Sequence, residues 1–197
     1  MQYVALLLVA LAASASAFAP AGMSARRRMA REASISDTLE SATGPNIYWG
    51  SNTQDKPENE IKGTTDYKKF SAAAKAAGVD LSSGEFTVLA PTDLAMEEAN
   101  KETLTKDEVN LHLIAGKKTT DALKGDQVTV QGKTLAYKRF ARQDYLDDAI
   151  IGQTPQGPAT GQTHPTFDCD NGIIHSIAFV LTADYANSIN LGTTTVV

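Results

Sequence analysis

Cys169 and His175 are the pair of residues that most directly suggests chemistry, because both lie in the stretch CDNGIIHSIAFVL at residues 169–181. A cysteine acts as a nucleophile or a metal ligand when a nearby base or positive charge stabilises its thiolate. The turn signal Asn171-Gly172 separates the two residues, and His175 falls on an apolar strand behind that turn. We therefore interpret the pair as a chance placement and predict no catalytic site.

The histidines and the cysteine do not form a pattern typical of a metal site. Zinc is held by three or four converging His, Cys or carboxylate ligands, and the chain has three histidines and one cysteine. His112 shares a predicted helical face with Val109 and Leu113, so we interpret His112 and His175 as structural residues that donate to backbone carbonyls. His164 lies in a loop and is a candidate interaction residue. No metal and no cofactor is predicted.

The acidic pair Asp147-Asp148 is the remaining candidate for acid–base chemistry. Neighbouring residues of a strand point to opposite faces, so the two carboxylates would not act together, and we expect them to be solvated surface charges. The chain also has no nucleophile elbow, phosphate-binding loop or dinucleotide fingerprint. We predict that the protein is not an enzyme.

The first 31 residues have the composition of a targeting sequence. An apolar run at residues 4–12, too short to span a bilayer, precedes the cleavage pattern Ala15-Ser16-Ala17 and indicates a signal peptide at residues 1–17. Residues 18–31 carry four arginines and no acidic residue, as transit peptides do. The joint ASAFAP (15–20) resembles the bipartite presequence of heterokont-type algae with complex plastids. An ordinary secreted protein with a basic propeptide is the alternative.

The charge of the chain excludes one class of partner. Its formal net charge is −5, and removal of the four arginines in residues 1–31 would make it −9. An acidic protein repels phosphate backbones, so nucleic acid is not expected as a partner. No apolar run after residue 31 is long enough for a transmembrane helix, so the mature chain is predicted to have none. We expect it in the stroma or associated with the thylakoid, with the cell surface as the alternative location.

Two segments are candidate contact surfaces. Residues 32–57 form a polar extension with a short helix predicted near residues 35–39, and NIYWG (46–50) lies within it. Tyr48 and Trp49 are candidate interaction residues, because aromatic side chains dominate interface energetics. The alternative is that Trp49 packs against its own domain. The long loop at residues 152–165, which contains His164, is the second candidate.

Periodicity and capping signals predict three helices around one strand in the middle of the chain. Residues 66–81 carry apolar residues on one face, with Asp66 at the start and Gly78 at the end. A strand at 85–91 is followed by a helix at 94–99, and a capping box opens a helix predicted over 105–116. A short helical turn is expected at 119–125.

The last part of the chain is predicted to consist mainly of strands. A hairpin is expected at 127–130 and 133–140, joined by Gln131-Gly132, and a single strand at 145–151. Residues 173–181 are apolar on both faces, which is typical of a central strand covered on both sides. The order of elements indicates an α+β fold.

Three ordered motifs resemble the signatures of fasciclin-like (FAS1) domains: FTVLAPTDLAM (86–96), LHLIAGK (111–117) and DNGIIHSIAFVL (170–181). The resemblance covers residues 58–185 as one FAS1 domain and leaves a C-terminal tail at 186–197. Three residues depart from the family pattern: Ala178 replaces an aspartate, Phe179 a common charged residue, and Leu111 a tyrosine.

The resemblance implies a wedge-shaped β-sandwich of two sheets with surrounding helices. It also implies that six residues belong to the structural motifs: Pro91, Thr92, His112, Asn171, Gly172 and His175. FAS1 domains are mostly adhesion or protein-interaction modules.

Together with the presequence, this favours a non-enzymatic interaction module in an algal plastid that binds a protein partner. A peripheral photosystem or antenna subunit in a thylakoid membrane complex is one concrete form. The alternatives are a secreted adhesion protein and a pigment or lipid binder whose pocket would use the apolar side chains of Ile173, Ile177 and Phe179.

Overall fold

A four-stranded mixed sheet forms the centre of the computed structural model, which describes residues 33–46, 56–61, 63–140, 143–151, 155–156, 162–163 and 165–184. Its strands, in spatial order, are β12 (Thr166–Cys169), β13 (Gly172–Ile177), β3 (Phe86–Pro91) and β4 (Leu113–Ala115). Strand β13 runs antiparallel to β12 and parallel to β3, and β3 runs antiparallel to β4. All six residues of β13 are buried, as expected for a central strand.

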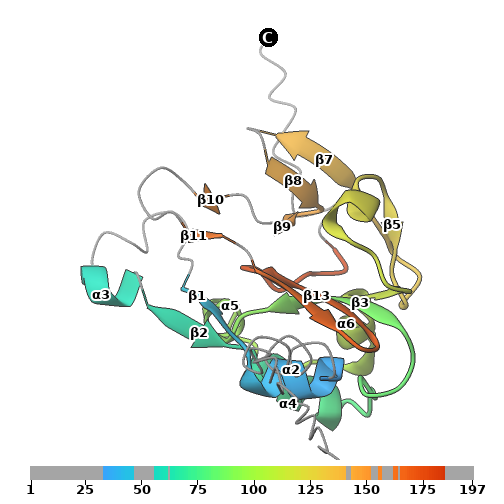
Figure 1. The fold of residues 1–197 in the computed structure, drawn as a ribbon, viewed down its shortest axis with the longest axis horizontal. Coiled ribbons are helices and arrows are strands. Elements are labelled where there is room, and N and C mark those ends of the chain that lie inside the picture. Colours follow the sequence, from blue (N-terminus) through green and yellow to red (C-terminus); the bar gives the residue numbers. More distant parts are fainter. Residues whose placement is uncertain are drawn as a thin grey trace, which may run out of the picture.

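A second layer of strands lies on one side of this central sheet (Figure 1). It contains the antiparallel meander β7 (Tyr137–Phe140), β8 (Gln143–Leu146) and β9 (Ala149–Ile151). The hairpin β5 (Gln127–Val128) and β6 (Thr134–Leu135) joins the edge of the central sheet through a bridge between Thr129 and Ile114. Two short pairs complete the strands: β1 (Thr43–Pro45) with β2 (Thr64–Asp66), and β10 (Pro155–Gln156) with β11 (Gln162–Thr163).

Helices lie on the opposite side of the central sheet, where Figure 1 shows α2 and α4 below β13 and β3. The described helices are α2 (Ile35–Ser41), α3 (Glu58–Ile61), α4 (Lys68–Ala76), α5 (Asp93–Glu98) and α6 (Lys106–Leu111), with a 3-10 turn η2 at Thr120–Leu123. None of the helices in the described ranges has the length and apolar character needed to span a bilayer.

The central sheet separates two hydrophobic cores. On the helix side, Val88 and Ile174 of the sheet pack with a cluster that includes Ile35 of α2 and Phe70 of α4. On the strand side, the sheet packs against a cluster from the second layer that contains Leu123, Leu135, Leu146 and Ile151. Full burial of each such side chain stabilises the fold by about 1.5–3 kcal/mol. The expected α+β class is confirmed, with a four-stranded sheet, a three-stranded sheet and shorter two-stranded pairs surrounded by helices, and no barrel closes among the described strands.

The helix predicted over 105–116 is shorter than expected. Its capping box is present, with Thr105 and Glu108 bonding each other's backbone, but helix α6 ends at Leu111. Leu113–Ala115 form strand β4, which pairs with β3. The helical spacing of apolar residues continues through residues 113–115, which explains the prediction of a longer helix. The backbone hydrogen bonds between β4 and β3 outweigh this local helix propensity.

Residues 145–151 form a hairpin and not the single strand that was predicted. Leu146 pairs with Ala149 across a turn made of Asp147 and Asp148. Asp147 has a φ of 53°, the left-handed conformation that two-residue hairpin turns require and that aspartate tolerates.

The strand predicted over 173–181 ends early, at Ile177. Residues 178–181 leave the sheet, and Ala178, Val180 and Leu181 remain buried there. The apolar run at residues 173–181 is longer than the strand because the residues that follow the strand are also buried.

Residues before position 58 take part in the same packed unit. Ile35 and Leu39 of α2 are buried in the helix-side core, so the segment predicted as a polar extension contributes to the fold. The start of α4 also differs from the prediction: its N-cap is Tyr67, not Asp66, and the carboxylate of Asp93 accepts the amide hydrogen of Lys69 at 2.8 Å. The two predicted targeting segments and the C-terminal tail lie outside the described residues.

Candidate functional site

Cys169 and His175 lie on opposite faces of the central sheet. Cys169 pairs with Gly172 and His175 pairs with Thr166, and successive residues of a strand alternate between faces. The Cys169 thiol points into the helix-side core, 3.3 Å from Thr38 Oγ1, and burial raises its pKa. The two side chains therefore cannot act as a nucleophile and its base.

His175 is held by hydrogen bonds on both ring nitrogens. Nε2 lies 3.0 Å from the Lys118 carbonyl oxygen, to which it donates, and Nδ1 lies 3.4 Å from the Thr166 hydroxyl, from which it accepts. Burial lowers the pKa of His175 below its usual value. The neutral ring thus fastens the segment around Lys118 across the strand-side face of the sheet.

His112 forms a similar link at the end of α6. Its Nδ1 donates to the Glu108 carbonyl oxygen at 2.8 Å, and its Nε2 accepts the Leu181 amide hydrogen at 3.0 Å. Complete burial lowers its pKa to about 4, and the Phe70 ring stacks at a tilt with 5.4 Å between ring centroids. The neutral His112 ring therefore links the backbone at Leu181 to the end of helix α6.

Asn171 and Gly172 bring three distant segments together. The Asn171 carboxamide accepts the Ile35 amide hydrogen at 2.8 Å and donates to the Leu81 carbonyl at 3.0 Å. Gly172 has a φ of 151°, and a Cβ at this position would stand 1.8 Å from the Phe86 carbonyl oxygen. Only glycine allows β13 to approach β3 this closely.

Pro91 and Thr92 form the junction between β3 and α5. Pro91 pairs with Ile177 at the end of the parallel ladder, and the Thr92 amide donates to the Ile177 carbonyl at 3.2 Å. The buried Thr92 hydroxyl accepts the Ala95 amide hydrogen at 3.1 Å and caps the helix. This geometry explains a threonine directly after the strand-ending proline.

The model of the Fasciclin domain family matches residues 65–183, more than half of the chain. The chain belongs to the fasciclin (FAS1) family. No curated protein matches it. The matched range includes all six motif residues described above. FAS1 domains serve as protein-interaction or adhesion modules and are generally not catalytic, so family membership assigns the protein to this broad functional class.

The FAS1 domain buries a charge that the sequence did not reveal. Asp147 is 4% exposed, accepts the Ala136 amide hydrogen at 2.8 Å and pairs with Lys133 at 3.1 Å, so the expectation of a solvated surface charge is wrong. Burial also raises the pKa of Asp148. The error follows from predicting a strand at the position of a turn, because the Asp147 carboxylate of that turn accepts a hydrogen bond from the backbone at Ala136, between β6 and β7.

No group of three or more His, Cys, Asp or Glu side chains that could hold a metal occurs among the described residues. Ile177 belongs to the strand-side core, and Ile173 is 4% exposed, so both are packed within the domain. The pigment or lipid pocket proposed around them has no support from this packing.

The candidate contact residues Tyr48, Trp49 and His164 lie outside the described residues, as does most of the loop at 152–165. The described surface offers two further features. Val128 and Val130 are exposed on β5 and just after it. A groove of about 430 Å³ runs between α2 and α4, lined in part by Ser36, Lys75 and Asp80. The alternation of polar residues and valines in the sequence at residues 127–130 could have predicted that the two valines share one face of a strand. The groove could not be predicted, because it depends on tertiary packing.

Proposed function

We propose that this FAS1 protein is a non-enzymatic interaction module that works in an algal plastid as a peripheral subunit of a thylakoid membrane complex. A photosystem or an antenna complex is the partner that this proposal names. The non-enzymatic part of the proposal rests on one observation: the side chains that could do chemistry are buried in structural contacts. His112 and His175 are neutral and bonded on both ring nitrogens, and Cys169 is buried on the other face from His175.

The location rests on the N-terminal sequence. A signal peptide at residues 1–17 followed by ASAFAP and an arginine-rich, acid-free segment has the organisation of a bipartite plastid presequence. The acidic charge of the remaining chain favours a protein partner over nucleic acid. We expect contact through Tyr48 and Trp49, with His164 and its loop as a second contact.

The location is tested by fusing residues 1–31 to a fluorescent protein in algal cells. We expect plastid fluorescence for the native sequence and its loss for Phe18→Ala, because Phe18 would start the transit peptide. A second fusion, of the full-length chain to the same fluorescent protein, carries the matched control Phe86→Ala, which alters an aromatic residue of the domain and leaves the presequence intact. Export of the native fusion to the medium would contradict the plastid location and support a secreted adhesion protein.

The partner is tested by native gradient fractionation of solubilised membranes and soluble extract, followed by mass spectrometry for this chain. Co-migration with a photosystem or antenna band is the expected result. Trp49→Ala should then shift the chain out of that band, whereas Tyr145→Ala, at an aromatic residue of β8, should leave it there. Recovery only from the wall or the medium would overturn the proposal, and an unchanged band for Trp49→Ala would exclude Trp49 as the contact.

A further inference from the structure

The groove between α2 and α4 is an open depression that continues along α4. Its volume is about 430 Å³, and a second hollow of about 340 Å³ shares Ser71 and Lys75 with it. The lining includes three apolar side chains and three serines: Ala74, Val79, Leu81, Ser36, Ser71 and Ser82. The depression therefore offers apolar contacts and hydrogen-bonding groups along one helix.

Asp80 gives this groove an uncompensated negative charge. Its carboxylate accepts hydrogen bonds from the Ser82 and Ser83 hydroxyls, both at 2.6 Å, and these bonds lower its pKa to about 2. Asp80 is therefore ionised at physiological pH, and no cation among the described residues pairs with it. The Lys75 ammonium also lines the groove, but it pairs with the Glu40 carboxylate. The charge of Asp80 is thus the one left over.

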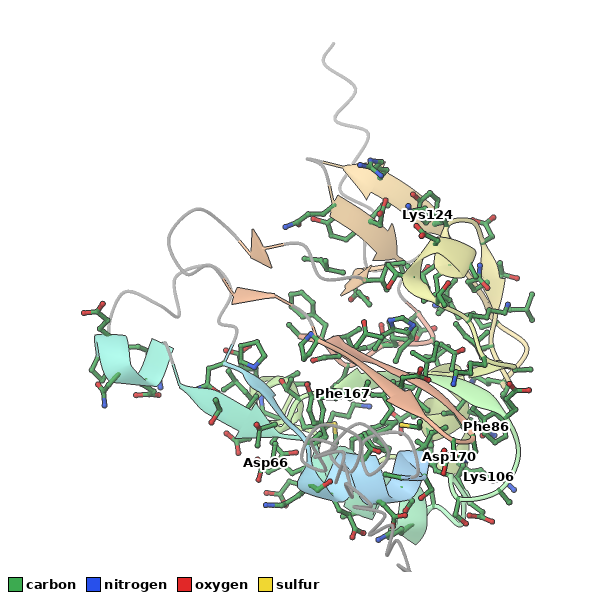
Figure 2. The ribbon with its side chains drawn as sticks, viewed as in Figure 1. Asp66, Phe86, Lys106, Lys124, Phe167 and Asp170 are labelled. Atoms are coloured by element: carbon green, nitrogen blue, oxygen red, sulfur yellow. The ribbon has the colours of Figure 1, made fainter. Side chains whose placement is uncertain are left out.

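The chain enters the domain beside this groove. The carbonyl oxygen of Ala33 accepts the Asp170 amide hydrogen at 3.2 Å, and Figure 2 shows Asp170 beside α2. Three residues after Ala33, Ser36 of α2 already lines the groove. Asp37 in the first turn of α2 and Asp170 are both exposed, so two further carboxylates lie close to this point of entry.

The segment that precedes Ala33 carries the complementary charge. Four arginines lie two to seven residues before Ala33, at positions 26, 27, 28 and 31, and residues 18–31 contain no acidic residue. An extended chain covers about 3.3 Å per residue, so these arginines can reach roughly 7–23 Å from Ala33. Helix α2 has seven residues and is therefore about 10 Å long. The segment is thus long enough to follow the groove back along α2.

Arginine is the side chain that suits such a groove best. Its guanidinium group forms paired, charge-assisted hydrogen bonds with a carboxylate, and its aliphatic stem packs on apolar surface. The segment RRRMAR (26–31) also contains Met29, a flexible apolar side chain that can fill an irregular depression. Both the charge and the apolar part of the lining therefore have a counterpart in this segment.

We propose that the arginine-rich segment at residues 26–31 docks in the groove between α2 and α4 of its own chain, where a guanidinium group bonds the Asp80 carboxylate. Met29 packs on the apolar part of the lining. Removal of the predicted targeting segment would open the groove, so the contact is an intramolecular cover that processing takes away. The processing step rests on the proposed presequence, whereas the docking depends only on the charge and position of the segment.

The first test is limited digestion of the full chain with trypsin, with cleavage after the four arginines followed by mass spectrometry. A docked segment enters the protease slowly, so Asp80→Asn should raise the cleavage rate there by roughly tenfold. The asparagine keeps the side-chain oxygen that accepts the Ser82 amide hydrogen at 2.9 Å, so the local turn is retained. An unchanged cleavage rate would overturn the proposal.

Two further variants show whether the effect belongs to the groove. Asp107→Asn removes the same charge from an exposed residue of α6 that does not line the groove, and it should leave the cleavage rate unchanged. Ser36→Lys adds a positive charge to the groove wall and should accelerate cleavage, even if Asp80→Asn disturbs its own loop. Equal acceleration by Asp107→Asn would mean that net charge alone acts, which contradicts docking.

The second test traps the contact as a disulfide between Arg28→Cys and Ser82→Cys in the full chain. Native Cys169 is 2% exposed and should not compete. We expect an intramolecular disulfide on mild oxidation, with a lower yield at 1 M salt, where the Debye length falls to about 3 Å. Adding Asp80→Asn should lower the yield, whereas adding Asp107→Asn should not. Absence of the disulfide would overturn the proposal, and a disulfide between two chains would assign the groove to a second copy instead.

Discussion

The two faces of the central sheet are held by different kinds of contact. On the helix side, apolar side chains of α2 and α4 pack on Val88 and Ile174, and side-chain hydrogen bonds cap the two helices, from Ser34 for α2 and from the more distant Asp93 for α4. On the strand side, buried polar and charged groups form links of their own, such as His175 to Lys118 and Asp147 to Lys133. Apolar packing therefore dominates the helix side, whereas the strand side also depends on buried polar partners distant in sequence.

The two halves of the chain differ in charge as well. Residues 32–116 contain 15 acidic and 7 basic residues, whereas residues 117–197 contain 8 acidic and 7 basic residues. The excess negative charge thus lies in the part that supplies the helices. A partner that approaches this side would meet a negative field, and one that approaches the second strand layer would meet almost none.

Gly172→Ala should have the largest effect, because it removes the close approach on which both faces depend. The added Cβ would stand 1.8 Å from the Phe86 carbonyl oxygen. We expect a loss of about 4 kcal/mol or more, or failure to fold, measured by urea denaturation. Gly78→Ala is the control: its φ is 70° but no atom lies within 4 Å of the new Cβ, so about 1–2 kcal/mol is expected. Equal losses of stability in the two variants would show that backbone strain, and not the steric clash with Phe86, determines the cost of Gly172→Ala.

Ile174→Ala and Ile177→Ala compare the two cores directly. Both side chains are 0% exposed and belong to β13, but they face the helix side and the strand side respectively. Each truncation should cost about 2–5 kcal/mol. Because one strand supplies both cores, far-UV and near-UV circular dichroism should report one coincident unfolding transition in each variant. Separate transitions for the two probes would mean that the faces unfold independently.

Acidification should weaken the link between α6 and Leu181. The folded protein holds the pKa of His112 at about 4, whereas the unfolded chain binds a proton near the ordinary value of 6.5. The unfolded state therefore binds more protons between these values, and stability falls as the pH drops from about 6.5 to 4. His175 acts in the same direction, and the raised pKa of Asp148 opposes it.

For His112 alone, the loss should approach about 3 kcal/mol at pH 4. Denaturation midpoints measured from pH 7.5 to 4 test this, with His112→Asn as the variant that should show a shallower pH dependence. A native protein whose stability is constant across this range would contradict the assignment of a neutral buried His112.

Lys133→Met should give a smaller loss that is specific to the strand side. It leaves the carboxylate of Asp147, which is 4% exposed, without its cation. We expect a cost of about 1–3 kcal/mol in thermal or urea denaturation. Lys124→Met, which breaks an exposed pair with Asp121, should cost less than about 1 kcal/mol. A reversal of this order would mean that the Asp147 pair contributes little to the strand side.

The sequence alone predicted the parts of the fold that have local causes. The capping box at Thr105 and the cap at Thr92 satisfy backbone groups within a few residues, and the turn at Asn171-Gly172 joins two strands that are adjacent in sequence, so these features are visible in the sequence. The boundaries that failed have tertiary causes. Strand β4 exists because β3 lies beside it, and the 147–148 turn exists because β9 returns to β8.

The candidate site shows the same limit. The roles of His112 and His175 are visible as histidines in apolar patterns, but their partners Leu181 and Lys118 could not be deduced.

The parallel pairing of β3 with β13 has a consequence for the stage of synthesis at which the domain can fold. Residues 86–91 must wait for residues 172–177 before the central ladder can close. Contacts between such distant segments form slowly, and a nascent chain that lacks its last strand cannot complete either core. The cores of the domain would therefore stay incomplete until nearly all of the polypeptide has been synthesised.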